Sequence, residues 1–391
     1  MSRYHSYLNS AVTILSTYEG KEPFASFIKK YFAQNKKFGS KDRKQVSHLC
    51  YCYFRLGKAL QEVSVEEKIL TALFFCSNES NEMLQQIKPE WNDKIELSLA
   101  DKISLIGYQF SIQDVFSWQD LLSESIDKES FTLSNLQQPN LFLRIRPGKE
   151  DLLKGKLSKG KIEFEVINGN CIVLPNSSKI EELIGLDKEA VVQDYSSQRV
   201  GKFIEMVRRR PSDHLPFSVW DCCAASGGKS IMAKDILGEI DLTVSDIRES
   251  ILINLKKRFL SAGIKNYKSF IADLTMPVKE LADKKFDLII ADVPCTGSGT
   301  WSRTPEQLFY FDSKKIEEYA LLQKKIVSNL IPHLLPDGYL LYITCSVFGS
   351  ENEEAIIFLK EKFHLELIRM ELLKGYYNKA DTMFAALLVN N

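Results

Sequence analysis

The spacing of apolar residues predicts helices in the first third of the chain. One apolar stripe at helical spacing consists of Leu8, Val12 and Leu15. A longer stripe consists of Val46, Leu49, Cys50, Tyr53 and Phe54. Ser40 is predicted to cap the helix that carries the longer stripe, with Asp42 in its first turn. Together with a shorter helix at Glu66–Cys76, these patterns predict an all-helical domain over residues 1–130.

Residues 131–215 show a different pattern, which is typical of a small α/β module. Asn140–Arg146 predicts a short strand with alternate apolar side chains on one face. Ile162–Val166 also alternates, and the dipeptide Asn168-Gly169 separates it from the apolar run Cys171–Leu174. Two such runs around an Asn-Gly turn predict a β-hairpin.

Candidate strands alternate with helices over residues 216–391. The candidate strands are Phe217–Trp220, Leu242–Ser245, Ser269–Ala272, Phe286–Ala291, Tyr339–Thr344, Leu365–Arg369 and Met383–Val389. Helical patterns lie between most of them, as in Ser313–His333 and Glu351–Phe363. This alternation predicts a parallel sheet with helices on both faces. Ligands of such sheets bind beyond the carboxyl ends of the strands, so functional residues are expected there.

Composition narrows the class of protein. The chain has 391 residues, 45% of them apolar and 26% charged, and at about 100–200 residues per domain this predicts two or three domains. These fractions are typical of soluble globular proteins and exclude collagen-like and wholly disordered chains. No apolar run approaches the roughly 20 residues that cross a bilayer. The apolar stretch Ala11–Leu15 is too short for a secretory signal, so we expect a cytoplasmic protein.

The formal net charge is zero, which excludes a uniformly basic nucleic-acid binder, but the charge is unevenly distributed. Residues 1–60 carry 11 basic and 3 acidic side chains, whereas residues 61–130 carry 5 basic and 14 acidic ones. The basic segment is either a footprint for phosphate groups or a solvated lysine cluster. A second basic run, Arg208–Arg210, is either a linker or an RNA contact.

Eight cysteines raise the questions of disulfides and of metal binding. The chain is long and shows no export signal, so we expect reduced thiols rather than a disulfide framework. With no Cys-x-x-Cys pair and only five histidines, the sequence supports a zinc site weakly. Four of the cysteines are interpreted as small buried apolar residues: Cys50, Cys52, Cys76 and Cys171.

Acidic residues follow three successive candidate strands. The first strand runs into Asp221 and the turn DCCAASGGKS at 221–230, whose two glycines let the backbone approach a ligand closely. Asp246 follows the second strand, 25 residues after Asp221, and Asp273 follows the third. One such acid is often a helix cap, but an acid about 20 residues beyond a glycine-rich turn suits ribose hydroxyls. Because the turn matches neither common phosphate-binding pattern, the sequence predicts a nucleoside ligand without phosphate.

Two cysteines stand at the ends of neighbouring strands. The fourth strand runs into Asp292 and Cys295, within DVPCTGSG, and the fifth runs into Cys345, within TCS. Either cysteine alone is more often structural than reactive. Both together, beside an aspartate, favour a site in which a thiolate acts as a nucleophile.

These segments, in this order and at this spacing, resemble the Sun/Fmu (RsmB-type) RNA cytosine-C5 methyltransferases. The resemblance is strong over residues 140–391 and includes VVQDYSSQ at 191–198 and GTWSRTPE at 299–306. It extends more faintly to residues 40–57, which are similar to the NusB-like helical domain of the ribosomal-RNA members. It implies a Rossmann-like class I methyltransferase domain over residues 216–391, with a mostly parallel seven-stranded sheet.

The resemblance also implies roles for individual residues. Cys345 would be the nucleophile that adds to carbon 6 of cytosine, Cys295 would assist its release, and Asp292 would lie near both the base and the cofactor. The implied cofactor is S-adenosylmethionine, with Asp246 on its ribose and Asp273 on the adenine side. The loop that lines it would be Cys223, Ala224, Ala225, Ser226, Gly227, Gly228 and Lys229. The implied partner is RNA, with ribosomal RNA as the first expectation, and we expect a monomer that needs no metal.

The chain departs from the family pattern at four positions. Arg146, Ser226, Ser230 and Val293 stand where asparagine, proline, threonine and proline are usual. None of these changes removes a group to which the resemblance gives a catalytic role. Three other functions remain open: methylation of transfer RNA, methylation of DNA or of a small molecule, and a non-catalytic assembly role on a methyltransferase scaffold.

Overall fold

The computed structural model describes residues 3–106, 110–208, 216–282 and 284–391, which fold into two compact units. The N-terminal unit is made of the described residues within 1–122, 127–139 and 300–313. The C-terminal unit is made of those within 123–126, 140–299 and 314–391. The predicted middle module thus shares one body with the predicted last domain, whereas a short segment of that last domain folds with the helices.

The N-terminal unit is helical, as the sequence predicts. Its helices are α1 (Arg3–Thr17), α2 (Phe24–Gln34), α3 (Ser40–Arg55), α4 (Val65–Cys76), α5 (Glu82–Ile87), α6 (Pro89–Asn92), α7 (Leu99–Ile106), α8 (Lys128–Ser134) and α14 (Pro305–Tyr310). The prediction that Ser40 caps α3 is wrong. The cap is Gly39, whose N–H donates to Oδ2 of Asp42 at 3.0 Å. Because the third helical residue reaches back to bond this N–H, the helix begins one position earlier than a serine cap would place it.

Residues 300–313 pack within the helical unit, although in sequence they lie between residues 140–299 and 314–391 of the C-terminal unit. The ring of Tyr310 packs edge-on against Tyr18 with centroids 5.4 Å apart, and its hydroxyl donates to the Tyr18 carbonyl at 2.7 Å. A carboxylate oxygen of Glu306 accepts a hydrogen bond from the N–H of Phe24, the first residue of α2, at 3.2 Å. The predicted domain of residues 1–130 is therefore incomplete without a segment from far along the chain.

The C-terminal unit is built on a seven-stranded sheet with the order β10-β11-β9-β8-β5-β6-β7. Its strands are β5 (Phe217–Asp221), β6 (Ile240–Asp246), β7 (Lys268–Ile271), β8 (Phe286–Asp292), β9 (Leu334–Thr344), β10 (Glu366–Leu373) and β11 (Met383–Val389). The five strands from β9 to β7 in this order are parallel, and the pairs β9–β11 and β11–β10 are antiparallel. This mostly parallel Rossmann-like sheet confirms the predicted fold class and all seven predicted strands.

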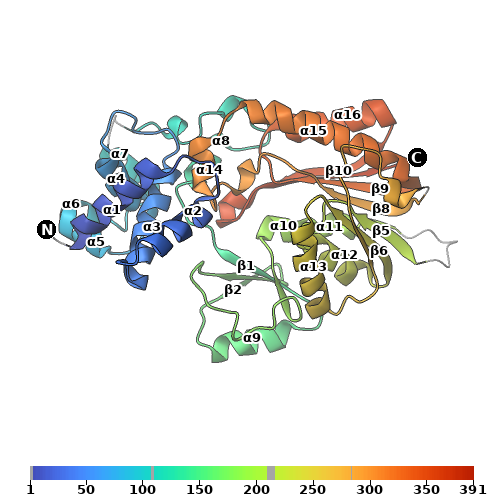
Figure 1. Ribbon diagram of the computed structural model, residues 1–391, viewed down its shortest axis with the longest axis horizontal. Helices are drawn as coiled ribbons and strands as arrows, with labels where there is room; N and C mark the ends of the chain where they lie inside the picture. Colours follow the sequence, from blue (N-terminus) through green and yellow to red (C-terminus); the bar gives the residue numbers. More distant parts are fainter. Residues whose placement is uncertain (1–2, 107–109, 209–215, 283) are drawn as a thin grey trace. The chain divides into compact units, whose positions relative to one another are not determined.

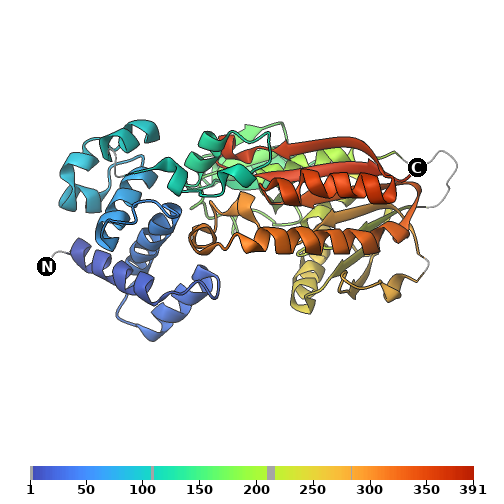
Figure 2. The same cartoon turned by 90° about the horizontal axis from the view of Figure 1, so that it is seen from above.

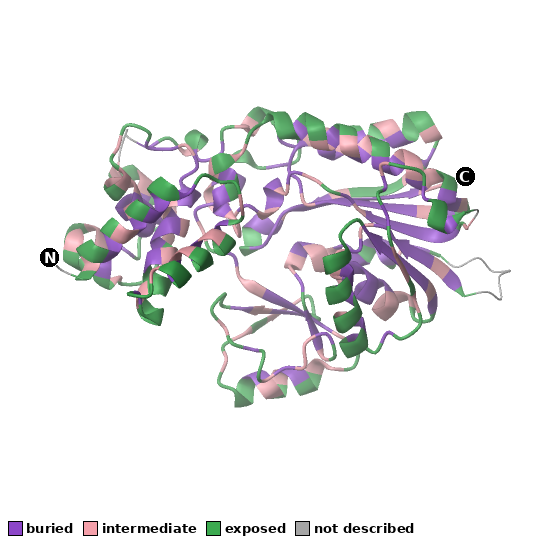
Figure 3. Cartoon of the chain, viewed as in Figure 1, coloured by how far each residue is buried: buried purple, intermediate pink, exposed green. Residues whose placement is uncertain are grey.

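Helices cover both faces of this sheet (Figures 1 and 2). One face carries α10 (Tyr195–Arg199), α11 (Gly201–Ile204), α12 (Gly228–Leu237) and α13 (Glu249–Ala262), and the other carries α15 (Lys314–Leu330) and α16 (Glu353–Phe363). The inner strands β5, β6, β8 and β11 are largely buried, whereas the edge strands β7 and β10 and the outer helix faces are partly exposed (Figure 3). β9 begins before the predicted Tyr339, because its turn-forming residues Pro336, Asp337 and Gly338 form an irregularity within the strand instead of ending it.

A smaller antiparallel sheet, with the order β2-β3-β1-β4, belongs to the same unit. Its elements are β1 (Leu141–Ile145), α9 (Glu150–Lys159), β2 (Glu165–Ile167), β3 (Cys171–Leu174) and β4 (Ala190–Val192). Strands β2 and β3 pair around Asn168 and Gly169, both of which have positive φ, so the predicted hairpin is confirmed. Leu153 and Leu157 of α9 are buried in the core of this small sheet.

Several sequence features have a plain structural outcome. All eight cysteines are free thiols. Of the basic run, Arg208 is exposed, and Arg209 and Arg210 lie outside the described residues. In the part of the chain that the structure describes, no helix is long and apolar enough to cross a membrane. Nor do the described residues include a group of three or more His, Cys, Asp or Glu side chains able to hold a metal ion.

Candidate active site

Four strand ends meet at one edge of the large sheet. Strands β6, β5, β8 and β9 are adjacent and parallel, so their carboxyl ends lie side by side. The last residues of the first three strands are Asp246, Asp221 and Asp292, and Cys345 follows the fourth. The fold therefore brings these residues to the edge where open α/β sheets bind their ligands.

The turn between β5 and α12 adopts a left-handed backbone that explains its small residues. Ala225 has φ +45° and Gly227 has φ +85°. A Cβ atom at position 227 would lie 2.5 Å from a ring carbon of Phe259, so only glycine fits against α13. The N–H of Gly227 donates to the carbonyl of Ala224 at 2.8 Å and closes the turn. Residues 223–229 thus form a narrow turn that runs into the first residues of α12, and their contact with a cofactor stays a prediction.

Asp221 is a buried carboxyl group with an unused oxygen. Its Oδ2 accepts a hydrogen bond from the Ser230 hydroxyl at 2.5 Å, whereas Oδ1 has no partner among the described residues. Burial raises the pKa of Asp221 to about 7, and the charges of Asp292 and Asp246 act in the same direction. Sequence reasoning marked this residue as a strand-end acid without giving it a role. Since buried polar atoms are rarely left unpaired, the free oxygen favours a ligand that brings a donor or a cation.

The other two strand-end acids have different surroundings. Asp246 is buried, and its Oδ2 accepts from the N–H of Ala225 at 3.0 Å, so it supports the β5–α12 turn directly. Its Oδ1 accepts from the N–H of Arg248 at 3.0 Å. Asp273 is exposed and accepts from the N–H of Thr275 at 2.9 Å, a bond that lowers the pKa of Asp273. The structure therefore joins Asp246 to the loop, and the cofactor role of Asp273 stays a prediction.

Lys229 connects the loop to Asp292. Its Nζ lies 3.1 Å from Oδ2 of Asp292 and donates to the hydroxyl of Ser197 at 2.8 Å. The ammonium group is nearly buried, whereas the carboxylate of Asp292 keeps 29% of its side-chain surface exposed. Sequence reasoning did not single out Ser197, although it lies in the VVQDYSSQ segment that carries part of the family resemblance.

The two predicted thiols are in contact. The Sγ atoms of Cys295 and Cys345 lie 3.2 Å apart, and the backbone N–H of Cys345 points to the sulfur of Cys295 at 3.4 Å. The hydrogen bond with Cys345, burial and the nearby charge of Glu351 together raise the pKa of Cys295 well above its ordinary value. The two sulfur atoms share one hydrogen bond, in which either thiol can be the donor.

Glu351 ties together the loops that carry the two cysteines, a role that sequence reasoning missed. This buried carboxylate accepts from the backbone N–H of Thr296 at 2.8 Å and from the hydroxyl of Thr296 at 2.6 Å. It also accepts from the hydroxyl of Ser346 and from Nε2 of Gln323. Thr296 follows Cys295 and Ser346 follows Cys345, so one side chain holds both loops. Burial raises the pKa of Glu351, whereas these hydrogen bonds lower it.

The strand order and the turn after β5 define a Rossmann-like fold. A crystal structure titled PH0851 matches it with a TM-score of 0.67 at 16% identity, over 92% of this chain and 93% of that one. A methyltransferase homolog protein from Pyrococcus horikoshii matches with a TM-score of 0.59 at 20% identity, over 74% and 98% of the two chains. NSun6 from Pyrococcus horikoshii, solved with SFG, gives 0.58 at 15% identity, over 70% and 97%. At these identities the likeness shows the fold alone.

Sequence comparison then names the family. Residues 206–387 match the family described as "16S rRNA methyltransferase RsmB/F", which confirms the resemblance. "Ribosomal RNA small subunit methyltransferase B" of Enterobacter sp. (strain 638) is 30% identical over 248 residues, 59% of this chain and 54% of that protein. The protein of the same name from Salmonella paratyphi A is 30% identical over 234 residues, 57% and 51% of the two. The chain thus spans about half the length of the curated relatives it matches.

Proposed function

We propose that this protein methylates carbon 5 of cytosine in RNA, with S-adenosylmethionine as methyl donor and small-subunit ribosomal RNA as substrate. The observation that carries the proposal is the pair of thiols, 3.2 Å apart at adjacent strand ends and close to the strand end that bears Asp292. The matching family and the names of the similar proteins support RNA, and ribosomal RNA in particular.

The residues at the strand ends fit a cationic nucleoside. Asp221, Asp246 and Asp292 place three carboxyl groups around the loop, and Lys229 is paired with Asp292. The unused Oδ1 of Asp221 offers an acceptor inside this group. When bound, S-adenosylmethionine supplies a methyl group on a positively charged sulfur, close to these strand-end carboxyl groups. A neighbour of the same fold was solved with SFG, an analogue of this cofactor, which also supports the assignment.

The two thiols suit the chemistry that cytosine requires. Carbon 5 is a poor nucleophile, but a thiolate that adds to carbon 6 makes carbon 5 electron-rich enough to take up a methyl group. In the proposed reaction the sulfur of Cys345 forms the bond to carbon 6, and a carbon–carbon bond then forms at carbon 5 as the methyl–sulfonium bond breaks. Loss of the carbon-5 proton to a base lets the bond between sulfur and carbon 6 break, which returns the Cys345 thiolate.

The different surroundings of the two thiols support this division of roles. With Cys295 as a neutral thiol and Cys345 as a thiolate, the 3.2 Å contact lets the S–H of Cys295 stabilise the attacking sulfur. The Cys295 thiol is also next to the sulfur of Cys345 when that sulfur leaves the ring at the end of the reaction, so it can assist the release. The carboxylate of Asp292, partly exposed where β8 ends, is assigned to the base ring, where its negative charge favours the protonated adduct. The target cytosine must be unpaired or flipped out of a helix to reach these groups.

The N-terminal unit is assigned to RNA binding. Six exposed lysines lie on α2, on α3 and between them: Lys29, Lys30, Lys36, Lys37, Lys41 and Lys44. Lys30 forms an ion pair with Glu22, and none of the other five lysines forms one within the described part of the chain. A positive surface of this kind attracts a phosphate backbone. Transfer RNA is the second candidate substrate. A non-catalytic assembly role is disfavoured by the intact pair of thiols.

Bisulfite sequencing of total RNA from cells with and without this protein tests the proposed function. We expect one or a few cytosines in small-subunit ribosomal RNA to lose methylation when the protein is absent. Loss confined to transfer RNA would select the second candidate. No change in any RNA, together with no turnover by the purified protein, would favour the assembly role.

Alanine in place of Asp246 is expected to weaken binding of S-adenosylmethionine at least about tenfold. The change removes an acceptor for ribose hydroxyls and also frees the N–H of Ala225, each a loss of about 1.5–3 kcal/mol for a charged hydrogen bond. Isothermal titration calorimetry measures the affinity, and circular dichroism checks the fold. Asp241→Ala, near the other end of β6, is the control and should bind normally. Equal affinity of Asp246→Ala and wild type would refute the assignment.

Reversal of three charges on the basic surface is expected to reduce the salt dependence of RNA binding. The variant changes Lys36, Lys37 and Lys44 to glutamate, and each lost phosphate contact lowers the slope of log K against log salt by about 0.7. Deletion of the first 130 residues is a poorer test, because it would strip residues 300–313 of their partners. Lys265, Lys360 and Lys362, all exposed, form the control triple. An unchanged slope in the first variant would mean that the lysines are only a solvated surface.

A further inference from the structure

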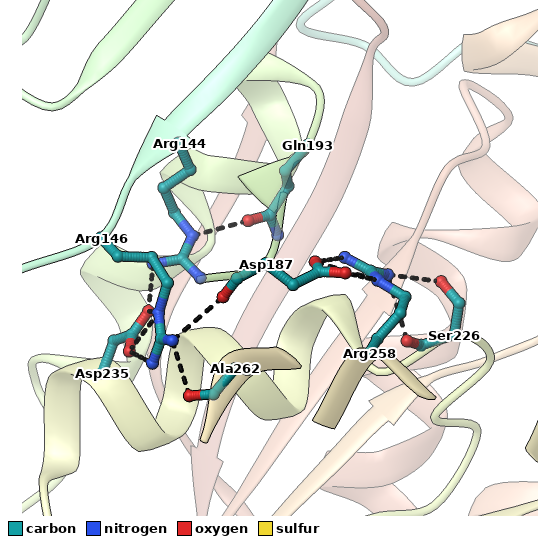
Figure 4. Close-up of polar contacts among 8 residues, drawn as sticks. All are labelled: Arg144, Arg146, Asp187, Gln193, Ser226, Asp235, Arg258 and Ala262. Atoms are coloured by element: carbon teal, nitrogen blue, oxygen red, sulfur yellow. Dashed lines mark hydrogen bonds and ion pairs between the residues drawn. The ribbon is translucent and has the colours of Figure 1, made fainter. Parts of the chain in front are cut away.

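The middle of the β5–α12 turn is held by an arginine from the next helix (Figure 4). Nη1 of Arg258, on α13, donates to the hydroxyl of Ser226 at 2.7 Å and to its carbonyl at 3.1 Å. Ser226 lies between Ala225 and Gly227, the two residues with left-handed backbones. Arg258 therefore binds the turn at the point where the backbone of the turn is most constrained.

Asp187, which lies outside the large sheet, orients the side chain of Arg258. Its carboxylate accepts from Nε of Arg258 at 3.0 Å and from Nη2 at 2.6 Å, so the guanidinium group is held from two sides. Asp187 lies between β3 and β4 of the small sheet, at φ +63°. Asp187 and Arg258 are largely buried, with 12% and 23% of their side-chain surfaces exposed. A paired carboxylate in this position fixes the direction of the guanidinium plane and thus of its bonds to Ser226.

The turn that carries Asp187 is itself anchored. Nη1 of Arg146, from the residue after β1, donates to the carbonyl of Asp187 at 3.0 Å and to the carbonyl of Ala262 at 2.7 Å (Figure 4). Nη2 of Arg146 is paired at 2.7 Å with Asp235 on α12, which also binds Arg144. The small sheet is thus joined to both helices that flank the β5–α12 turn.

We propose that Arg258 is a positioning residue for the cofactor loop, aimed by Asp187 and acting through Ser226. The proposal rests on the proposed use of S-adenosylmethionine. Arg258 need not touch the cofactor; it holds the turn in the form that the cofactor meets, so that binding does not have to order it. Two of the positions at which this chain departs from its family, Arg146 and Ser226, take part in the same network.

The test is the affinity for S-adenosylmethionine, measured by calorimetry on the full chain. Arg258→Lys keeps the charge but loses the guanidinium group that binds Ser226 and Asp187 at once. Asp187→Asn keeps the size of the side chain but loses the negative charge that orients Arg258. Each is expected to weaken binding about tenfold, the effect of losing one charge-assisted hydrogen bond. Arg199→Lys, which alters a similar ion pair with Glu371 in the same unit, is the control and should leave the affinity unchanged.

A proline at position 226 separates loop positioning from a general loss of structure. Ser226 has a negative φ, which the proline ring fixes near about −65°, so the ring holds the turn by other means. In the Ser226→Pro background, Arg258→Lys is therefore expected to change the affinity less than about twofold instead of tenfold.

The outcomes distinguish this proposal from the proposed function. If the wild-type protein does not bind S-adenosylmethionine, the cofactor assignment is wrong, and the positioning role of Arg258 is wrong with it. If the wild type binds S-adenosylmethionine and Arg258→Lys binds it equally well, only the positioning role of Arg258 is overturned. Arg258→Lys could also lower the affinity tenfold in the Ser226→Pro background, with a lower melting temperature in both backgrounds. That result would overturn the positioning role, because the arginine would then act on overall stability.

Discussion

Alanine in place of Cys345 is expected to abolish RNA methylation and to leave no covalent protein–RNA species. Without a thiolate to add to carbon 6, carbon 5 of cytosine stays too poor a nucleophile to take the methyl group. The loss of turnover should be at least about 10³-fold, as for other enzymes deprived of a covalent nucleophile. Incorporation of labelled methyl groups into RNA measures turnover, and denaturing electrophoresis detects the adduct.

Alanine in place of Cys295 is expected to have a different result. The neighbouring Cys345 can still attack and the methyl group can still be transferred, but release of the enzyme from the ring is impaired. A protein–RNA species that survives denaturation should therefore accumulate. Cys171→Ala, in β3 of the small sheet, is the control and should retain turnover without an adduct.

Two results would contradict the assignment of roles. If Cys345→Ala is the variant that accumulates the adduct, Cys295 is the nucleophile and the roles are reversed. If both variants keep normal turnover, the mechanism with two thiols is wrong. The 3.2 Å contact between the sulfur atoms would then be only the packing of two small side chains.

Glutamine in place of Glu351 is expected to lower kcat about 100-fold while leaving the affinity for S-adenosylmethionine unchanged. The variant keeps the size of the side chain but removes the charge that accepts from Thr296 and Ser346. Hydrogen bonds to a charged group contribute about 1.5–3 kcal/mol, and each 1.36 kcal/mol in the barrier corresponds to about tenfold in rate. Loosened loops would no longer hold the two sulfur atoms in contact. Single-turnover kinetics and calorimetry measure the two quantities separately.

Tyr342→Phe is the matched control for this prediction. The Tyr342 hydroxyl donates to the carbonyl of Glu351 at 2.8 Å and to Oε1 of Gln323 at 3.0 Å, within the same buried cluster. It does not bond to either cysteine loop in the described structure, so its loss should lower the melting temperature without a comparable loss of kcat. If the two variants lose kcat equally, Glu351 acts only through stability.

The pH dependence of stability provides an independent readout for Glu351. Burial raises its pKa above the ordinary value of 4.5, so the folded protein holds this proton more tightly than the unfolded chain. Its contribution to stability is therefore fully present below pH 4.5 and is lost as the pH rises through the raised pKa. Glu351→Gln should lack this decline, which denaturant unfolding at several pH values measures.

The sequence by itself determined the sheet and the residues at its edge. The seven strands follow from short apolar runs that alternate with helical patterns, because a strand in a parallel sheet is buried on both faces. The positions of Asp246, Asp292 and Cys345 at the strand ends follow from the same pattern, since parallel strands end on the same edge. The order of the motifs was enough to indicate the family, which sequence comparison confirmed.

Other features could not be predicted, because they depend on contacts between residues far apart in the chain. Glu351 has no distinctive sequence signal, and it becomes important only because folding places it between Thr296 and Ser346. The start of α3 at Ser40, with Gly39 as its cap, depends on one side-chain bond from Asp42, which the usual preferences for capping residues do not reveal.

Only the tertiary structure decided which parts of the chain form one body. Residues 300–313 look from their position like part of the predicted methyltransferase domain, yet they fold with the N-terminal helices, where Tyr310 packs edge-on against Tyr18. The grip of Asp187 and Arg258 on Ser226 likewise joins three segments that are separate in sequence. Local apolar periodicity determines whether a segment is a helix or a strand. Which partner buries that segment, and which charge pairs with which, is settled by long-range packing, because those energies exist only once the chain has folded.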